Sequence, residues 1–187
     1  MTKFPFWQAR LDAKEGWFDA TKTWTAQQRD LETCRLWADI RHRATGVKRL
    51  VDFGAGLQRF RPHATAGGID YLAVDVLPAL ASDPNGHSWF HLFDGRTPIP
   101  QEIDGDVALY CLVIQHLDDT DTLLALNASR AKTVIVIDGA WKSDGYTMAR
   151  EWAQYEALLQ AAGCGAWSHD VLQTPLVRYK VNVGLRP

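Results

Sequence analysis

The chain has 187 residues, 47% of them hydrophobic and 22% charged, which suits one globular domain and excludes a disordered or low-complexity chain. Its 20 basic and 22 acidic residues leave a formal charge of −2, so no overall field favours nucleic acid or an anionic membrane as a partner. No apolar run reaches membrane-spanning length, and the N-terminal sequence lacks a signal-peptide core. The cysteines form no Cys-x-x-Cys pair, and we therefore expect a cytoplasmic protein.

Residues 1–23 are aromatic-rich and irregular, and the first predicted helix follows them within residues 24–46. Thr25 can cap this helix, with Gln28 three residues later as its capping-box partner, and Gly46 ends it. The spacing of its apolar residues predicts that one stripe faces the core, formed by Leu31, Cys34 and either Trp37 or Ala38.

Beyond residue 46, short apolar runs alternate with helical or turn segments. We predict strands at about 48–53, 71–76, 88–93, 106–114, 132–138, 166–172 and 178–185. Helices are predicted over 118–131, with acidic residues in its first turn, and over 146–163, while Pro62 leaves only a short first crossover helix. This alternation predicts a mostly parallel sheet covered on both faces, whose ligands bind beyond the carboxyl ends of the strands.

The stretch "RLVDFGAGLQRF" reads as a buried strand that ends in a glycine turn. Gly54 and Gly56 let the backbone turn sharply and approach a ligand without an intervening Cβ, although a plain strand-to-helix turn uses glycines too. A dinucleotide fingerprint would need a third glycine at the position of Arg59, which disfavours a pyrophosphate-binding site.

Two further acidic residues end predicted strands. Asp75 lies about 20 residues after the glycine turn, where a carboxylate can accept hydrogen bonds from both ribose hydroxyls. Asp94 ends the third strand in "FDG", at a position that could meet an adenine edge. Three consecutive predicted strands thus end in "DFGAG", "VDV" and "FDG". We therefore favour an adenosine-type ligand over a set of solvated strand-end carboxylates.

These segments, in this order, resemble the motifs of the class I S-adenosylmethionine-dependent methyltransferases, in their small-molecule branch. "VDFGAGLQRF" resembles the first motif, D-x-G-x-G, with Asp52, Gly54 and Gly56 in register. "YLAVDV" resembles the second motif, whose acidic residue holds the ribose, and "FDGRTPIP" resembles the segment that meets the adenine. "DVALYCLVIQHLDD" is similar to the fourth motif, "TVIVID" to the fifth strand, and the C-terminal sequence to the closing helix and hairpin.

The resemblance covers about residues 47–187 and implies an α/β fold with a single Rossmann-like methyltransferase domain. The sheet would be mostly parallel and seven-stranded, with helices on both faces and a final antiparallel hairpin, and residues 1–46 would form a helical cap or lid. The resemblance implies S-adenosyl-L-methionine as cofactor and methyl transfer to an oxygen, nitrogen or other nucleophile of a small metabolite. The cofactor-binding residues that it implies are Asp52, Gly54, Gly56, Gln58, Asp75, Asp94 and Leu112.

The chain departs from the family pattern at Gln58, where a third glycine is common. Its side chain would either crowd the methionine tail of the cofactor or donate a hydrogen bond to the cofactor's carboxylate. His116 is the histidine placed to accept a proton from the acceptor, although it could equally pack under the cofactor or cap the following helix. Contacts to the acceptor are expected from Tyr110, Gln115, Asp138 and Trp141.

Two other classes of function stay open. One is a non-catalytic cofactor-binding interaction module, which Gln58 favours. The other is an enzyme that uses the same cofactor for lyase-type chemistry, or one that binds a nicotinamide dinucleotide. The remaining histidines show no ligand spacing with the cysteines, and amino-methylating motifs for an extruded base are absent, so we expect neither a metal site nor a nucleic-acid substrate.

Overall fold

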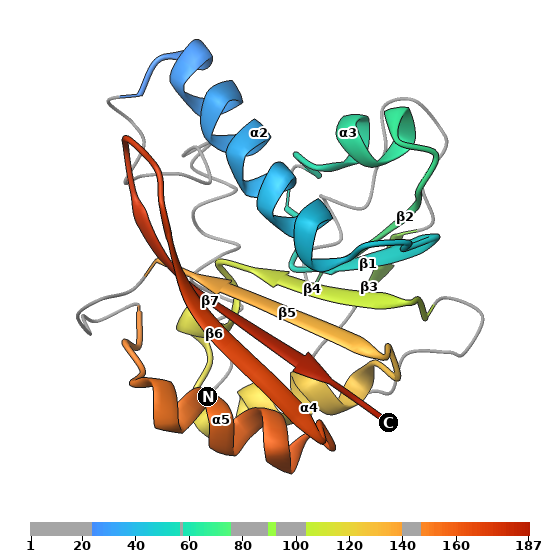
Figure 1. Cartoon of the computed structure of the whole chain (residues 1–187), viewed down its shortest axis with the longest axis vertical. Coiled ribbons are helices and arrows are strands. Elements are labelled where there is room, and N and C mark those ends of the chain that lie inside the picture. The colour runs from blue at the N-terminus through green and yellow to red at the C-terminus, as the bar shows by residue number, and fades with distance from the viewer. Residues whose placement is uncertain (1–23, 57, 76–89, 93–103, 140–146) are drawn as a thin grey trace.

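The structure of the chain is a computed structural model, which describes residues 24–56, 58–75, 90–92, 104–139 and 147–187. A single β-sheet forms the centre of these residues. Its strands lie in the order β3-β2-β1-β4-β5-β7-β6 (Figure 1). Their bounds are β1 Arg49–Phe53, β2 Asp70–Asp75, β3 Phe90–Leu92, β4 Val107–Cys111, β5 Thr133–Asp138, β6 Ala166–Gln173 and β7 Arg178–Leu185.

Strands β1 to β5 are parallel, and β7 runs antiparallel to both β5 and β6. The prediction of a mostly parallel sheet with a closing antiparallel hairpin is therefore confirmed. The register aligns Asp52 with Ala73 on one side and Leu109 on the other, so the carboxyl ends of these strands share one edge. Strand β4 ends at Cys111, earlier than predicted, because the chain turns at Leu112 and enters the short 3-10 helix η4, Ile114–His116.

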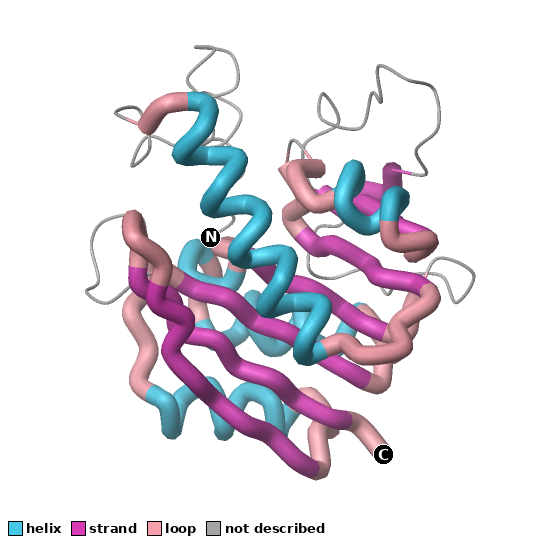
Figure 2. Tube along the Cα trace, turned by 45° about the horizontal axis from the view of Figure 1, so that its top comes forward, coloured by secondary structure: helices cyan, strands magenta, loops and turns pink. Residues whose placement is uncertain are grey.

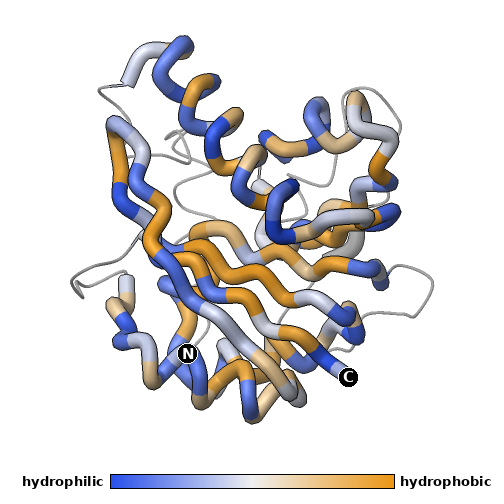
Figure 3. Tube along the Cα trace, in the orientation of Figure 1, coloured by the Kyte–Doolittle hydropathy of each residue, from blue (hydrophilic) through white to orange (hydrophobic). Residues whose placement is uncertain are grey.

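Two pairs of helices pack against opposite faces of this sheet. Helices α2 (Ala26–Arg43) and α3 (Arg61–Ala66) lie on one face, and α4 (Asp119–Ala128) and α5 (Trp152–Ala161) lie on the other (Figures 1 and 2). Each face has its own cluster of buried apolar side chains, because successive strand residues point to opposite sides. Hydrophobic residues accordingly follow the central strands (Figure 3).

The capping of α2 is confirmed, but its predicted inward face is wrong. The Thr25 hydroxyl accepts the Gln28 backbone N–H at 3.1 Å, and the Gln28 side chain accepts the Thr25 N–H at 2.8 Å. Leu31 is 47% exposed, and Cys34 and Ala38 are exposed too, while Trp37 packs only at the margin of the core. The buried side chains are instead those of Glu32, Leu36 and Ile40, which are spaced four residues apart.

The other predicted helices differ at their ends. Helix α4 starts after Asp118, whose side chain accepts the Asp121 N–H, as the acidic first turn predicts. Helix α3 is only 6 residues long and carries Pro62 in its first turn, as expected. Helix α5 begins at Trp152 rather than near residue 146, because residues 147–151 make contacts with η4 in place of a helical turn.

Candidate functional site

The glycine turn after β1 is fixed to the carboxyl end of β2. The N–H groups of Gly54 and Ala55 both donate to the Val74 carbonyl, at 2.7 and 3.3 Å. The Gly56 N–H donates to Oδ2 of Asp75 at 3.0 Å, and Asp75 is only 5% exposed. The fold therefore brings together the backbone of the turn and the carboxylate that sequence analysis assigned to a ribose.

The two glycines of this turn are needed for different reasons. Both have left-handed backbones, with φ of +68° at Gly54 and +51° at Gly56, which side chains disfavour. A Cβ on Gly54 would lie 2.4 Å from a methyl group of Val113, so this glycine allows the loop after β4 to approach. A Cβ on Gly56 would meet nothing nearer than a backbone oxygen at 4.0 Å. Among the described residues, therefore, no side chain crowds the position that a Cβ would occupy on Gly56.

Gln58 adopts the backbone conformation that a third glycine would take. Its φ is 55°, and its N–H closes the turn on the Ala55 carbonyl at 2.8 Å. Left-handed backbone is uncommon for a residue with a side chain and concentrates at functional sites. The departure from the family pattern thus changes the side chain offered at this position and keeps the path of the turn.

Asp52 lies on the face of the sheet that α2 and α3 cover, where its partner Tyr71 belongs to the buried cluster. It is 3% exposed, and its carboxylate accepts the hydroxyl of Tyr71. Burial raises the pKa of Asp52 to about 7, although the Tyr71 hydroxyl and the charge of Arg59 both lower it. The charge of Asp75 also raises this pKa, so Asp52 lies near the carboxylate that pairs with Gly56.

Arg59 lies beside the same carboxylate and was not predicted to have a role. Its guanidinium donates to the Cys111 sulfur at 2.9 Å and lies 4.7 Å from the centre of the Phe60 ring. Burial raises the pKa of the Cys111 thiol to about 11, so this cysteine at the end of β4 is a neutral thiol. Cys111 lies 52 residues after Arg59, so no local pattern in the sequence could have identified this contact.

The end of β4 contributes the second half of the site. Leu112 has a φ of 62°, and its N–H donates to the Ile137 carbonyl at 2.7 Å, so the chain leaves the sheet in a strained turn. Its side chain lies beside Gly139, near the end of β5. Leu112 is therefore placed at the carboxyl edge where the resemblance expects a cofactor contact.

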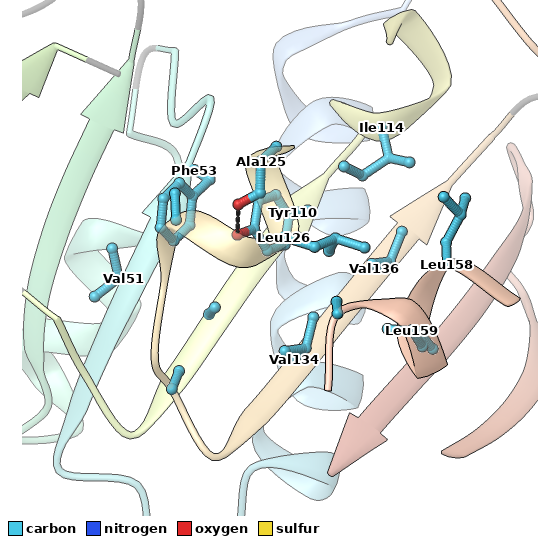
Figure 4. Packing of buried hydrophobic residues seen from close by; sticks show 14 of the residues in the cluster. Val51, Phe53, Tyr110, Ile114, Ala125, Leu126, Val134, Val136, Leu158 and Leu159 are labelled. Carbon is cyan, nitrogen blue, oxygen red and sulfur yellow. Dashed lines mark hydrogen bonds between the residues drawn. The ribbon is translucent and has the colours of Figure 1, made fainter. Parts of the chain in front are cut away.

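Tyr110 belongs to the core rather than to the acceptor side. It is 0% exposed, its ring stacks on Phe53 with centroids 4.6 Å apart, and its hydroxyl donates to the Ala125 carbonyl at 2.7 Å (Figure 4). Every residue of β4 is buried, so the sequence could not show which face each side chain occupies. The expected contact between Tyr110 and an acceptor is not supported by this placement.

Gln115 and Asp138 form a buried network between η4 and the end of β5. The carboxylate of Asp138 accepts the backbone N–H of Gln115 at 3.3 Å and the hydroxyl of Tyr155 at 2.6 Å, and Asp138 is 0% exposed. Burial raises the pKa of Asp138 to about 6, against the effect of the Tyr155 hydroxyl. Both carboxylate oxygens are engaged inside the protein, so Asp138 shapes the loop rather than facing an acceptor.

His116 is half-buried at the end of η4, beside this network. Its Nε2 lies 3.3 Å from the side-chain nitrogen of Gln115. The remaining predicted site residues, Asp94 and Trp141, lie outside the described residues. One edge of the sheet thus carries five of the predicted site residues: Gly56, Gln58, Asp75, Leu112 and His116. The close approach of Val113 to Gly54 joins the glycine turn to the loop after β4.

Arg150 holds the turn that carries His116 and was not predicted. Its side chain is 1% exposed, and its guanidinium donates to the carbonyls of Ile114 and Leu117 at 3.0 and 2.6 Å. Further bonds run to Asp119 at 2.9 Å and to Thr122 at 3.2 Å. These partners lie 28 to 36 residues away in the chain, so no local pattern could have identified them.

Among the described residues, no three histidine, cysteine or acidic side chains gather as ligands for a metal ion. No helix in the same part of the chain combines the length and apolar character needed to cross a membrane.

The sequence matches no protein-family model and no curated protein, but the fold has many solved counterparts. A SAM-dependent methyltransferase from Archaeoglobus fulgidus superposes with a TM-score of 0.68 at 14% identity, covering 84% of this chain and 94% of that one. The methyltransferase SibL gives 0.68 at 18% identity, with 96% of this chain covering 61% of SibL. Magnesium protoporphyrin IX methyltransferase from Synechocystis PCC 6803, with bound SAH, gives 0.63 at 10% identity and coverages of 87% and 88%. The chain therefore has the fold of the class I S-adenosylmethionine-dependent methyltransferases.

Proposed function

We propose that this chain is an S-adenosylmethionine-dependent methyltransferase that acts on a small molecule. The observation that carries the proposal is the pairing of Gly56 with Asp75. The backbone N–H of Gly56, which no side chain covers at its Cα, donates to the buried carboxylate of Asp75 at 3.0 Å. This pairing fits the ribose of a nucleoside cofactor. The fold supports the proposal, because structures that share it include SAM-dependent methyltransferases, one of them with bound SAH.

Five described residues would hold the cofactor. Asp75 would accept hydrogen bonds from the ribose hydroxyls, and its bond to Gly56 fixes the carboxylate in place beforehand. Leu112 would pack against the cofactor at the end of β4, and Gln58 would meet its amino-acid tail at the third glycine position. Gly54 keeps the loop of Val113 close, so that the two halves of the site stay joined. We keep Asp94 as the proposed adenine contact. When bound, the cofactor supplies an electrophilic methyl group on a sulfonium.

His116 would accept the proton that an acceptor hydroxyl or amine must lose. The support for this role is its position: it is half-buried at the carboxyl edge, in a turn that Arg150 and Gln115 hold from two sides. A base role predicts that His116→Ala lowers kcat by roughly 10²-fold or more while the affinity for SAH stays unchanged. If the histidine only packs, the same variant loses stability and SAH affinity together, and the base role is wrong.

Residues 1–46 would form a cap over the acceptor. The support comes from α2: Glu32, near its N-terminal end, accepts the Thr174 hydroxyl at 2.8 Å. Thr174 lies in the turn between β6 and β7, and β7 begins beside the carboxyl end of β5, where Asp138 pairs with Lys180. The first turns of α2 therefore lie at the edge of the sheet that carries the site, and we propose that residues 1–23 and Trp141 contribute to the acceptor pocket from there.

The proposal is tested by the effect of SAH on the melting temperature. A ligand that binds only the folded state raises it by mass action, so we expect a rise that grows with SAH concentration. Asp75→Ala should weaken SAH binding by about 1–3 kcal/mol, the range for a lost polar partner. Asp70→Ala is the matched control, because Asp70 starts the same strand at the opposite edge and pairs with Arg49. Equal losses in the two variants would show that Asp75 does not hold the cofactor.

A further inference from the structure

Glu32 carries one carboxylate oxygen that is buried without a hydrogen-bond partner. The residue is 2% exposed, and its Oε1 accepts the Thr174 hydroxyl at 2.8 Å. No donor among the described residues forms a hydrogen bond with the second oxygen, Oε2, which is buried as well. Buried polar atoms nearly always have a partner, because leaving one without it is costly. Oε2 therefore has the property expected of an atom that receives its donor from a ligand.

The Glu32 carboxylate lies on the side of the sheet edge where we place the acceptor. The β6–β7 hairpin rises beside the first half of α2, and Thr174 joins the two there (Figure 1). Tyr179, near the start of β7, lies beside the same carboxylate, since burial and then Glu32 raise the pKa of Tyr179. The Tyr179 ring is 3.8 Å from the position that a Cβ would occupy on Gly139, which Leu112 also approaches. One tyrosine thus links Glu32 to a proposed cofactor contact.

Neither Tyr179 nor a cation within the described part of the chain satisfies this carboxylate. The Tyr179 hydroxyl lies close to Glu32 but outside hydrogen-bond geometry with Oε2, and none of the ion pairs in this part of the chain includes Glu32. Arg59 also lies near Tyr179. Its guanidinium, however, donates to Cys111, and its charge lowers the pKa of Asp52.

A protonated amine supplies both things that the Glu32 carboxylate lacks, a hydrogen-bond donor and a positive charge. We propose that Oε2 of Glu32 binds an amino group of the methyl acceptor, which is therefore a small molecule that carries a protonated amine. Because Thr174 holds Oε1, Oε2 keeps one direction and the amine is held in one place.

The inference rests on the proposed function, because only a methyltransferase has a methyl acceptor to recognise. It also says which atom is not methylated. A protonated nitrogen has no lone pair, so the amine bound to Glu32 cannot attack the methyl group of the cofactor. This amine serves recognition, and another atom of the acceptor receives the methyl group.

The test is a titration of the full-length protein with three small probes, followed by ligand-observed NMR, with and without S-adenosylhomocysteine. Ethylammonium has both the charge and the donor, ethanol has a donor without charge, and tetramethylammonium has charge without a donor. We expect saturable binding of ethylammonium, and binding of each of the other two that is weaker by about 10-fold or more.

Two variants assign this binding to Glu32. Glu32→Gln keeps an oxygen for Thr174 but removes the charge and Oε2, so the affinity for ethylammonium should fall by about 10-fold or more. Its melting temperature without ligand should be unchanged or higher, because an unpaired buried oxygen is lost. Glu156→Gln is the matched control and should bind ethylammonium like the wild type, because Glu156 is a half-exposed glutamate of α5, on the opposite face of the sheet.

Three results would overturn the inference. They are the absence of saturable ethylammonium binding to the wild type, equal binding of the three probes, and unchanged ethylammonium binding in Glu32→Gln. A melting temperature of Glu32→Gln well below that of the wild type would overturn it too, because the carboxylate would then be a structural group with its partners in place. None of these measurements needs methyl transfer. A failure to bind S-adenosylhomocysteine would remove the proposed function, while the ethylammonium titration would still decide whether Glu32 binds an amine.

Discussion

Replacing Asp52 by asparagine should make the stability of this protein less dependent on pH. The carboxyl group is 3% exposed, and burial raises its pKa from 3.8 to about 7 in the folded state. Between these values the folded protein keeps a proton that the unfolded chain has released. The sign follows: this group's favourable contribution is complete below about pH 4 and is lost as the pH rises through about 7.

The size of the effect follows from the same two values. A difference of about 3 pKa units is worth about 4 kcal/mol, at about 1.4 kcal/mol per unit. Relative to Asp52→Asn, the wild type should therefore lose about 1.4 kcal/mol of unfolding free energy per pH unit across this window. The absolute offset between the two proteins depends on whether the new amide finds an acceptor beside Tyr71, so the slope is the quantity to compare.

The assay is urea denaturation of both proteins at several pH values from 4 to 8. Asp106→Asn is the control with the opposite sign, because the backbone N–H groups of Arg49 and Lys48 lower the pKa of Asp106. Its wild-type contribution is complete above about pH 4 and is lost only at lower pH, so between pH 4 and 8 the stability of Asp106→Asn should run parallel to that of the wild type. Parallel pH dependences for wild type and Asp52→Asn would refute the reasoning, because the carboxyl group would then titrate alike in the folded and unfolded states.

Three further predictions concern the scaffold of the site. Gly54→Ala should lower the free energy of unfolding by at least about 2 kcal/mol, because an alanine would have a left-handed backbone and its Cβ would clash with Val113. Adding Val113→Ala should recover part of this loss in a double-mutant cycle. Additive effects of the two substitutions would contradict the contact. Gln58→Gly should leave the melting temperature unchanged or higher, because glycine relieves the φ of 55°, and a clear decrease would show a stabilising side chain. Arg150→Met should lower the free energy of unfolding, measured by chemical denaturation, by about 3–5 kcal/mol, because it leaves buried carbonyls unpaired. The control Arg130→Met, at an exposed residue, should change it by less than about 0.5 kcal/mol. Equal effects of the two substitutions would contradict the role of Arg150.

The features that could be predicted from the sequence are those that local chemistry determines. The Thr25 and Gln28 capping box closes within three residues, and Pro62 shortens α3 where it stands. The apolar runs locate the strands, and their alternation with helices is enough to predict a parallel sheet. The left-handed turn at Gly54 and Gly56 follows from residue type alone, and the pairing of this turn with Asp75 follows once neighbouring strands end at one edge.

The features that could not be predicted depend on partners far along the chain. Glu32 faces inward because Thr174, 142 residues later, donates to it, whereas the apolar Leu31 remains at the surface. Tyr110 could be placed on either face, since β4 is buried throughout. The partner of Asp52 could not be predicted either, because the hydroxyl that donates to its carboxylate belongs to Tyr71, 19 residues later.

The measurement that tests the account most directly is calorimetric titration of the full chain with S-adenosylhomocysteine and, separately, with NAD. We predict saturable binding of S-adenosylhomocysteine at one site per chain and no comparable binding of NAD, because Arg59 stands where a dinucleotide turn needs its third glycine. Saturable binding of NAD without binding of S-adenosylhomocysteine would contradict the assignment of this site to a methyl-donor cofactor.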